Sequence, residues 1–387
     1  MKHNLRRLVS GSASLPAVGV LGLMFFAVTC ASAVEPDIPR IQASAEKGSI
    51  QQEIELAGAY FEGRGVSRDE KQAAYWYEKA ANSGDPGAQL QIGFFYEAGV
   101  GVERDPARAA LWFQRAVASG SVAAKVNLGV AYTWGSGVRK DPEFATKLFR
   151  EAAEKGSGAG AYFLADAYYF GVGVQKDPDQ ARHWLEVAAK RHDPQAELSL
   201  GILLLRQSDE SQQERGLKLL RDAAKSGYVA ARHELALRLV RKPEFTSSPT
   251  EAIGLLQDAS SQGFWKSTVV LGVLYRDGRG ASKDAETAYL HFQIAALQGG
   301  EAGTKMVQND LRALEKVLDP ARIKSLNEKA ADWVATHRQQ LEFVRYPNGG
   351  KEFPNFALSY PEEGVHAGRI FPTGESDGPL RRHLSRR

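Results

Sequence analysis

One short motif in the sequence could support nucleophilic catalysis. Ser44 and Lys47 have the spacing of the Ser-x-x-Lys pair, in which a serine hydroxyl attacks an acyl group. Enzymes that use this pair also carry Ser-Asp-Asn and Lys-Thr-Gly, and neither tripeptide occurs in the 387 residues. So short a pattern is expected roughly once by chance in a chain of this size. We therefore assign no catalytic role to Ser44.

Glycine pairs such as Gly99 and Gly101 suggest a second chemistry, the binding of phosphate. A phosphate loop needs Gly-Lys-Ser/Thr or a preceding strand, and here the pairs recur in five places between helical patterns. They are interpreted as turns. The eight histidines form no His-Glu-x-x-His motif. We expect no metal site, no cofactor and no enzymatic activity.

Composition limits the class of protein. Hydrophobic residues make up 43% of the chain and charged residues 25%, which is enough to bury a core. The single cysteine, Cys30, excludes a disulfide scaffold. There are 49 basic and 46 acidic residues, and Lys2, Arg6 and Arg7 account for the difference. Because the rest of the chain is balanced, a nucleic-acid partner is not expected.

The N-terminus has the pattern of an export signal. The three basic residues precede an apolar segment over about 15–28, and Ala31-Ser32-Ala33 follows it. This order predicts a secretory signal over 1–33 that is cut after Ala33, and hence a periplasmic or secreted protein. The alternatives are an uncleaved membrane anchor, for which about fourteen apolar residues are too few, and a lipoprotein acylated at Cys30.

A repeat of 36 residues organises the rest of the chain. Glycines recur at Gly48, Gly84, Gly120 and Gly156, and the series continues with His192, Gly227, Gly263 and Gly299 with a single step of 35. Leu or Ile keeps the same period, and a small residue always follows it, as in Leu128-Gly129. Several registers sharing one period indicate a repeat protein. The small residue is expected to face a neighbouring helix.

Each repeat is predicted to be a pair of helices. In the copy over 88–120, apolar residues follow a helical face up to Gly99, where glycines permit positive φ and end the first helix. Asp105-Pro106 then supplies an N-cap and a proline suited to the first helical position. One such pair cannot bury its apolar stripe alone, so successive pairs must stack into a solenoid.

These residues resemble the Sel1-like repeat family. The best match is the copy over 88–120, with Ile92-Gly93, Tyr96, the turn at 99–102 and Trp112. The resemblance covers about 45–300 and implies an all-α, right-handed superhelix of about seven two-helix repeats, related to tetratricopeptide arrays, that binds partners. Some cysteine-rich members have been described as β-lactamases, but this mature chain would lack the disulfides of those relatives.

In such solenoids the first helix of each repeat lines the concave face. Two repeated positions on these helices carry polar residues in some copies and apolar residues in others, and aromatic residues occur late in the helix. Tryptophan and tyrosine often dominate protein interfaces. The candidate partner-binding residues are Gln91, Asn127, Trp134, Asp166 and Tyr169, with the Asn127 amide expected to contact a peptide backbone. The alternative is that the aromatic residues merely pack against the next repeat.

Two copies and the C-terminus depart from the pattern. Arg206–Arg215 replaces the glycine turn of the fifth copy, and Lys242-Pro243-Glu244 that of the sixth, so the array is expected to bend or loosen over about 205–250. We expect a linker over 34–44, the array over 45–300, capping helices over 301–345 and a flexible tail over 346–387. Arginines at the end of the tail offer the one possible membrane contact.

The sequence therefore predicts a non-catalytic, exported scaffold that binds a protein or peptide on its concave face. The alternatives are a binder of an envelope polymer such as peptidoglycan or another carbohydrate and, with less support, a β-lactamase-like hydrolase. The partner itself is not identified by the sequence.

Overall fold

The fold is an α-solenoid, as predicted. The computed structural model describes residues 36–241 and 250–345, and within these ranges the chain forms sixteen α-helices and no strand. Seven helix pairs follow one another along the chain, and each helix packs against the next. The expected signal over 1–33, the Lys242-Pro243-Glu244 segment and the tail over 346–387 lie outside the described residues.

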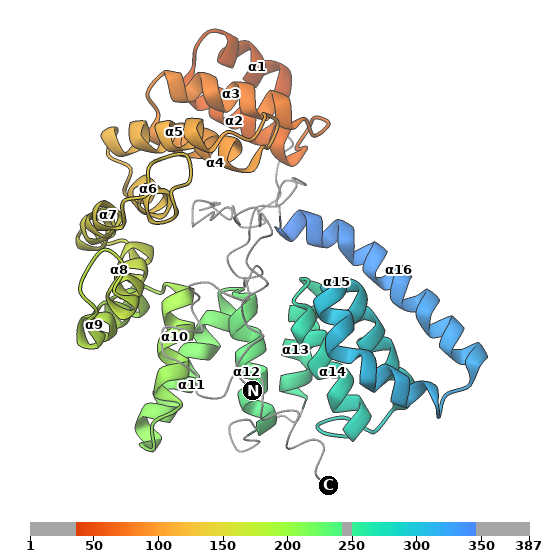
Figure 1. Ribbon diagram of the computed structural model, residues 1–387. Coiled ribbons are helices and arrows are strands. Elements are labelled where there is room, and N and C mark those ends of the chain that lie inside the picture. Colours follow the sequence, from red (N-terminus) through yellow and green to blue (C-terminus); the bar gives the residue numbers. More distant parts are fainter. Residues whose placement is uncertain (1–35, 242–249, 346–387) are drawn as a thin grey trace, which may run out of the picture.

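The first helices of the seven pairs are α2 (Ile50–Glu62), α4 (Pro86–Ala98), α6 (Val122–Trp134), α8 (Gly158–Phe170), α10 (Pro194–Leu204), α12 (Val229–Arg241) and α14 (Trp265–Asp277). The second helices are α3 (Glu70–Asn82), α5 (Pro106–Ala118), α7 (Pro142–Glu154), α9 (Pro178–Lys190), α11 (Glu210–Lys225), α13 (Glu251–Ser261) and α15 (Ala285–Glu315). The pairs form an open arc, with α6 and α8 on its inner side and α7 and α9 outside them (Figure 1).

The segment expected to be a linker is mostly helical. Helix α1 (Ile38–Glu46) packs on α2 and ends before Gly48, in the register where the second helix of each pair ends. It therefore acts as the second helix of an incomplete first repeat. Its Ile38 and Ile41 are buried, which gives α2 an apolar neighbour at the N-terminal end of the array.

Glycines fix both ends of the turn between the helices of a pair. Gly135 ends α6 in the left-handed region, with φ 76° and ψ 30°. Gly137 follows with φ 69°, and a Cβ built on it would lie only 1.9 Å from the carbonyl oxygen of Pro106 in the preceding repeat. The equivalent Gly101 and Gly173 approach Glu70 and Pro142 in the same way, at 2.0 Å. In these three turns the second glycine thus seats one repeat against the previous one.

The small residue after each Leu or Ile faces a helix, as expected. A Cβ on Gly129 would lie 2.6 Å from the ring of Phe149 in α7, and Gly93 and Gly272 meet Phe113 and Phe292 in the same geometry. In the fourth pair the register carries Ala165 and Leu185 instead, both of them fully buried. In this pair the first helix has Ala instead of Gly, and the second helix has Leu instead of the larger Phe.

Side-chain donors join successive repeats. The carbonyl at one repeated position, in the last turn of a second helix, accepts a hydrogen bond from a side chain further along the chain. The pairs are Lys79–Ala45, Gln89–Ala81, Arg191–Ala153, Arg232–Ala224 and Gln298–Ser260, with donor-to-oxygen distances of 2.7–3.2 Å. Carbonyls at a helix C-terminus have no partner within the helix and carry partial negative charge, so these donors satisfy them.

The fifth repeat packs closely where loosening was expected. It lacks the glycine turn, but Gly201 of α10 and Gly216 of α11 allow their backbones to approach, and a Cβ on Gly216 would lie 2.8 Å from the Gly201 carbonyl oxygen. A second glycine thus gives the fifth pair a close helix contact in place of the missing turn, and the expected bending or loosening over about 205–250 stays a prediction.

The C-terminal end of the array is covered by one long helix. Helix α15 bends at Gly300, where φ is 58° and ψ −134°, so the chain turns one residue after the Gly299 of the repeat series. Helix α16 (Pro320–Arg345) packs along α15, burying Leu326 and Ala330, and Arg322 forms an ion pair with Glu286. No helix within the described residues is long and apolar enough to span a membrane.

Candidate partner-binding site

The five residues proposed as partner contacts lie on α4, α6 and α8. Gln91 is half-buried on α4, and Asn127 is buried in the middle of α6. Trp134 is the last residue of α6 and has 38% of its surface exposed. Asp166 and Tyr169 are both buried on α8. The structure brings only Trp134 and Asp166 together in one pocket.

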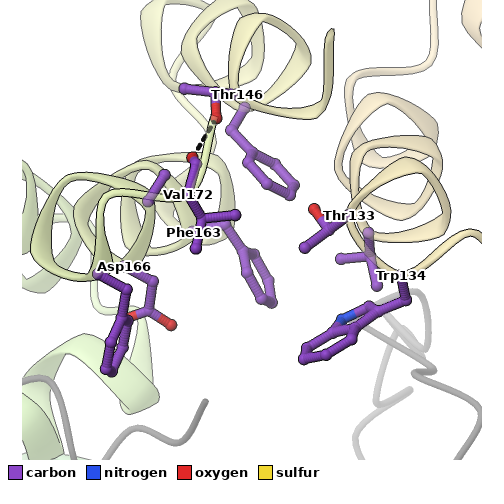
Figure 2. Close-up of a pocket in the computed structure, with 10 residues that line it drawn as sticks. Thr133, Trp134, Thr146, Phe163, Asp166 and Val172 are labelled. Carbon is purple, nitrogen blue, oxygen red and sulfur yellow. Dashed lines mark hydrogen bonds between the residues drawn. The ribbon is translucent and has the colours of Figure 1, made fainter. Parts of the chain in front are cut away.

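The pocket lies between α6, α7 and α8 on the inner side of the arc. It has about 470 Å³ of empty volume and opens to solvent. Figure 2 shows Trp134 and Thr133 on one side of it, with Phe163 and Asp166 on the other. The lining residues are Val130, Thr133, Trp134, Thr146, Phe149, Phe163, Asp166, Ala167, Phe170 and Val172.

Aromatic rings form most of the walls. Phe149 and Phe163 are stacked, with ring centroids 5.2 Å apart and an angle of 24° between the planes. Phe170 takes on α8 the repeat position that Trp134 takes on α6, and both are more than one-third exposed. Large aromatic side chains with exposed faces offer apolar area to a partner at a low entropic cost.

The pocket arises from the side chain at one repeated position. Asp166 occupies the register that holds Phe94 on α4 and Ile202 on α10, both buried apolar residues. An aspartate is shorter than either, so it leaves space on the face of α8 that looks toward α6.

Two of the three polar residues named in Figure 2 are fully used by the protein itself. The Thr133 hydroxyl donates to the carbonyl of Gly129 at 2.9 Å. The Thr146 hydroxyl lies 2.9 Å from the Pro142 carbonyl and 3.0 Å from that of Val172. The bond from Thr146 to Val172 joins α7 to the turn that follows α8.

Asp166 is the exception. Only 5% of its surface is exposed, and its Oδ1 atom has no hydrogen-bond partner among the described residues. Burial raises the pKa of the Asp166 carboxyl well above its usual range; the Tyr162 hydroxyl on the same helix lowers it, and Asp193 raises it further. The carboxyl is thus buried without a positive charge to stabilise its ionised form.

The other three candidates lie outside the pocket. The Asn127 amide donates to the carbonyl of Ala123 at 2.9 Å, one turn earlier in its own helix. The Tyr169 ring lies beneath the Lys176 ammonium, 5.5 Å from its centroid, and against Phe170. Neither residue lines the pocket, nor does Gln91, so the expected contact of Asn127 with a peptide is not supported by its position.

Sequence reasoning did not select the threonines or Phe149 as part of the site. Phe149 lies on a second helix, whereas the predicted concave face consists of first helices alone. The 36-residue register still carries a signal, because Thr133 and Trp134 follow the Leu128 position by five and six residues and both line the pocket. In the described part of the chain, no three His, Cys, Asp or Glu side chains are grouped to hold a metal ion.

Comparison with known proteins agrees with the fold. The Sel1 repeat model matches residues 53–85, 86–121, 122–157, 158–193 and 267–300. The two unmatched pairs between 193 and 267 are those that depart from the repeat pattern. A search of curated proteins gave no match.

The chain is also similar to solved structures. A Sel1 repeat protein of Oxalobacter formigenes is 26% identical over 70% of this chain and 79% of its own, with a TM-score of 0.51. A protective antigen of uropathogenic Escherichia coli strains, which displays an SLR fold, is 25% identical over 81% of this chain and 75% of its own, with a TM-score of 0.45. The five matched segments, and the solenoid built from them, show that this chain contains Sel1 repeats.

Proposed function

We propose that this chain is a scaffold that binds a protein or peptide in the pocket between α6 and α8. Sel1 repeats are typically non-catalytic modules for protein–protein interaction, which supports the general function. The observation that carries the specific site is an exposed tryptophan, Trp134, at the mouth of an aromatic pocket on the inner side of the arc. Such residues contribute a large share of the energy at interfaces.

A display library of random peptides tests this proposal. The full mature chain is used to select binders, which are then compared on Trp134→Ala and on Leu111→Ala. Leu111 lies on α5, outside the pocket, and is 57% exposed, so its variant removes a similarly exposed apolar side chain elsewhere. Selected peptides are expected to lose at least about tenfold in affinity for Trp134→Ala and to bind Leu111→Ala normally.

Two results would count against this proposal. Peptides that bind Trp134→Ala as tightly as the unchanged protein would show that the contact lies outside the pocket. A glycan array that retains the chain while no peptide does would favour a binder of envelope polymers.

We also propose that the protein is exported. Support comes from the basic N-terminus, the apolar segment and Ala31-Ser32-Ala33, which together have the pattern of a cleaved signal. Expression of the full sequence in a bacterium, followed by terminal sequencing of the periplasmic fraction and the medium, should return Val34. An intact Met1 on protein retained in the cytoplasm would contradict export.

A further inference from the structure

Four other carboxyl groups in the described repeats are buried to the same extent as Asp166, and each has a partner. Glu53 lies 3.0 Å from the Lys79 ammonium. Glu97 accepts from the Ser136 hydroxyl at 3.0 Å, with the Arg104 guanidinium 3.7 Å away. Asp193 caps α10 by accepting from two backbone amides, and Glu197 lies 3.2 Å from His192. A buried carboxyl in this protein is therefore normally compensated.

Asp166 is the one of these five carboxyl groups that has neither a cation nor a backbone amide donor among the described residues. Its Oδ1 atom is buried and lacks a hydrogen-bond donor within the described residues, although the side chain lines an open pocket (Figure 2). The other charged group close enough to influence it is Asp193, which is also an acid. The base of the pocket is thus complementary to a positive charge that the protein itself does not provide.

The walls specify the rest of the ligand. Trp134, Phe163 and Phe170 line the route to Asp166. Aromatic faces pack well against methylene groups and attract a cation through their quadrupole. An apolar ligand would fill the walls but leave the carboxyl buried without a partner, which opposes binding. A lysine side chain satisfies both requirements, because it carries a compact ammonium on a four-carbon stem.

Resting on the proposed peptide-binding function, we propose that the pocket takes a lysine side chain of the partner, with its ammonium against Asp166 and its stem between Trp134 and the two phenylalanines. Arginine fits less well, because its planar fork presents five donors to a pocket with one uncommitted carboxyl.

The experiment uses two small probes with the full mature chain. Nα-acetyl-lysine methylamide and Nα-acetyl-norleucine methylamide differ in the terminal charge. Each is titrated while the indole N–H resonance of Trp134 is followed by NMR, after assignment with Trp134→Phe. We expect the lysine probe to bind at least about tenfold more tightly than the norleucine probe. Equal affinities, or no response of Trp134 to either, would overturn the inference.

Matched variants separate recognition from folding. Asp166→Asn should bring the two affinities within about twofold. Glu97→Gln, which alters a buried carboxyl one repeat earlier, should leave the lysine preference intact. Asp166→Ile, which inserts the residue found at position 202, should abolish lysine binding and raise the thermal midpoint of the free protein. A lowered midpoint, with the lysine preference unchanged, would show that Asp166 is structural.

The two proposals can fail separately. If display selection gives peptides that depend on Trp134 but contain no enriched lysine, the scaffold stands and the lysine inference is wrong. If the lysine probe binds but no selected peptide does, the cation site stands and the scaffold is wrong.

Discussion

The contact between turn and helix makes Gly137→Ala the sharpest test of how the repeats are joined. Gly137 has φ 69°, and a Cβ at this position would lie 1.9 Å from the oxygen and 2.2 Å from the carbon of the Pro106 carbonyl. Pro106 begins α5, so the obstacle is the backbone of the preceding repeat and cannot rotate away. The turn or the whole helix must shift.

Two costs add. A left-handed backbone costs an alanine about 1–2 kcal/mol relative to glycine. Forcing an extra carbon into a closed contact costs about 1–3 kcal/mol more. Gly137→Ala should therefore lower the free energy of unfolding by about 2–5 kcal/mol. Gly135→Ala is the control, because it has φ 76° but the nearest atom to its Cβ would be Lys140 Cβ at 3.3 Å, and backbone atoms would lie no closer than 3.5 Å. It should lose about 1–2 kcal/mol.

The assay is urea unfolding followed by circular dichroism, combined with native-state hydrogen exchange. Exchange is needed because long arrays can unfold in parts and then have no single free energy. Gly137→Ala should speed exchange in α5 and α6 more than Gly135→Ala does. If the two variants unfold at the same urea concentration with the same exchange pattern, the contact with Pro106 is not a constraint and our account of the repeat junction is refuted.

Three further predictions concern single positions. Gly129→Ala should cost about 1–3 kcal/mol, because its Cβ would lie 2.6 Å from the ring of Phe149; adding Phe149→Leu should recover at least about 0.5 kcal/mol in a double-mutant cycle, and strict additivity would argue against the pairing. His192 has φ 56° where other repeats have glycine, so His192→Gly should raise the urea midpoint by the equivalent of about 0.5–1 kcal/mol; a lower midpoint would show that its contact with Glu197 outweighs the strain. Burial lowers the pKa of His233 to about 3. As the pH falls, the unfolded chain therefore binds a proton at this histidine before the folded chain does, and the free energy of unfolding decreases from pH 6.5 toward pH 3. Between pH 7.5 and 5, wild type should lose about 2 kcal/mol more than His233→Gln in urea titrations, whereas parallel losses would show that this histidine is not the group responsible.

The repeat geometry was predictable because it depends on local chemistry. Asp105-Pro106 caps and starts α5 with the side-chain bond expected of it, and Gly99 ends α4 in the left-handed region. These features need no knowledge of distant residues. The contact of Gly129 with a neighbouring helix was predictable in the same way, because every repeat has Gly or Ala at that position.

The pocket was only partly predictable, because it depends on where along each helix the neighbouring repeats cover a side chain. Asn127 and Trp134 are both on α6, yet one is buried with its amide bonded within the helix and the other is exposed at the end. The helical period cannot separate these outcomes, because residues seven apart lie on nearly the same face and differ in their position along the helix. The close approach of Gly201 and Gly216 was missed because Gly216 lies outside the repeated glycine positions.

The seated turn glycine also bears on how such an array can lengthen or shorten during evolution. Gly101, Gly137 and Gly173 each rest on the second helix of the preceding repeat, so the spacing between turn and helix is fixed wherever this contact exists. An insertion or deletion of one residue would unseat the glycine, and only whole repeats can be gained or lost there. The single step of 35 residues occurs in the fifth repeat, where the turn has no glycine to seat. Repeat length and turn contact are thus relaxed at the same place.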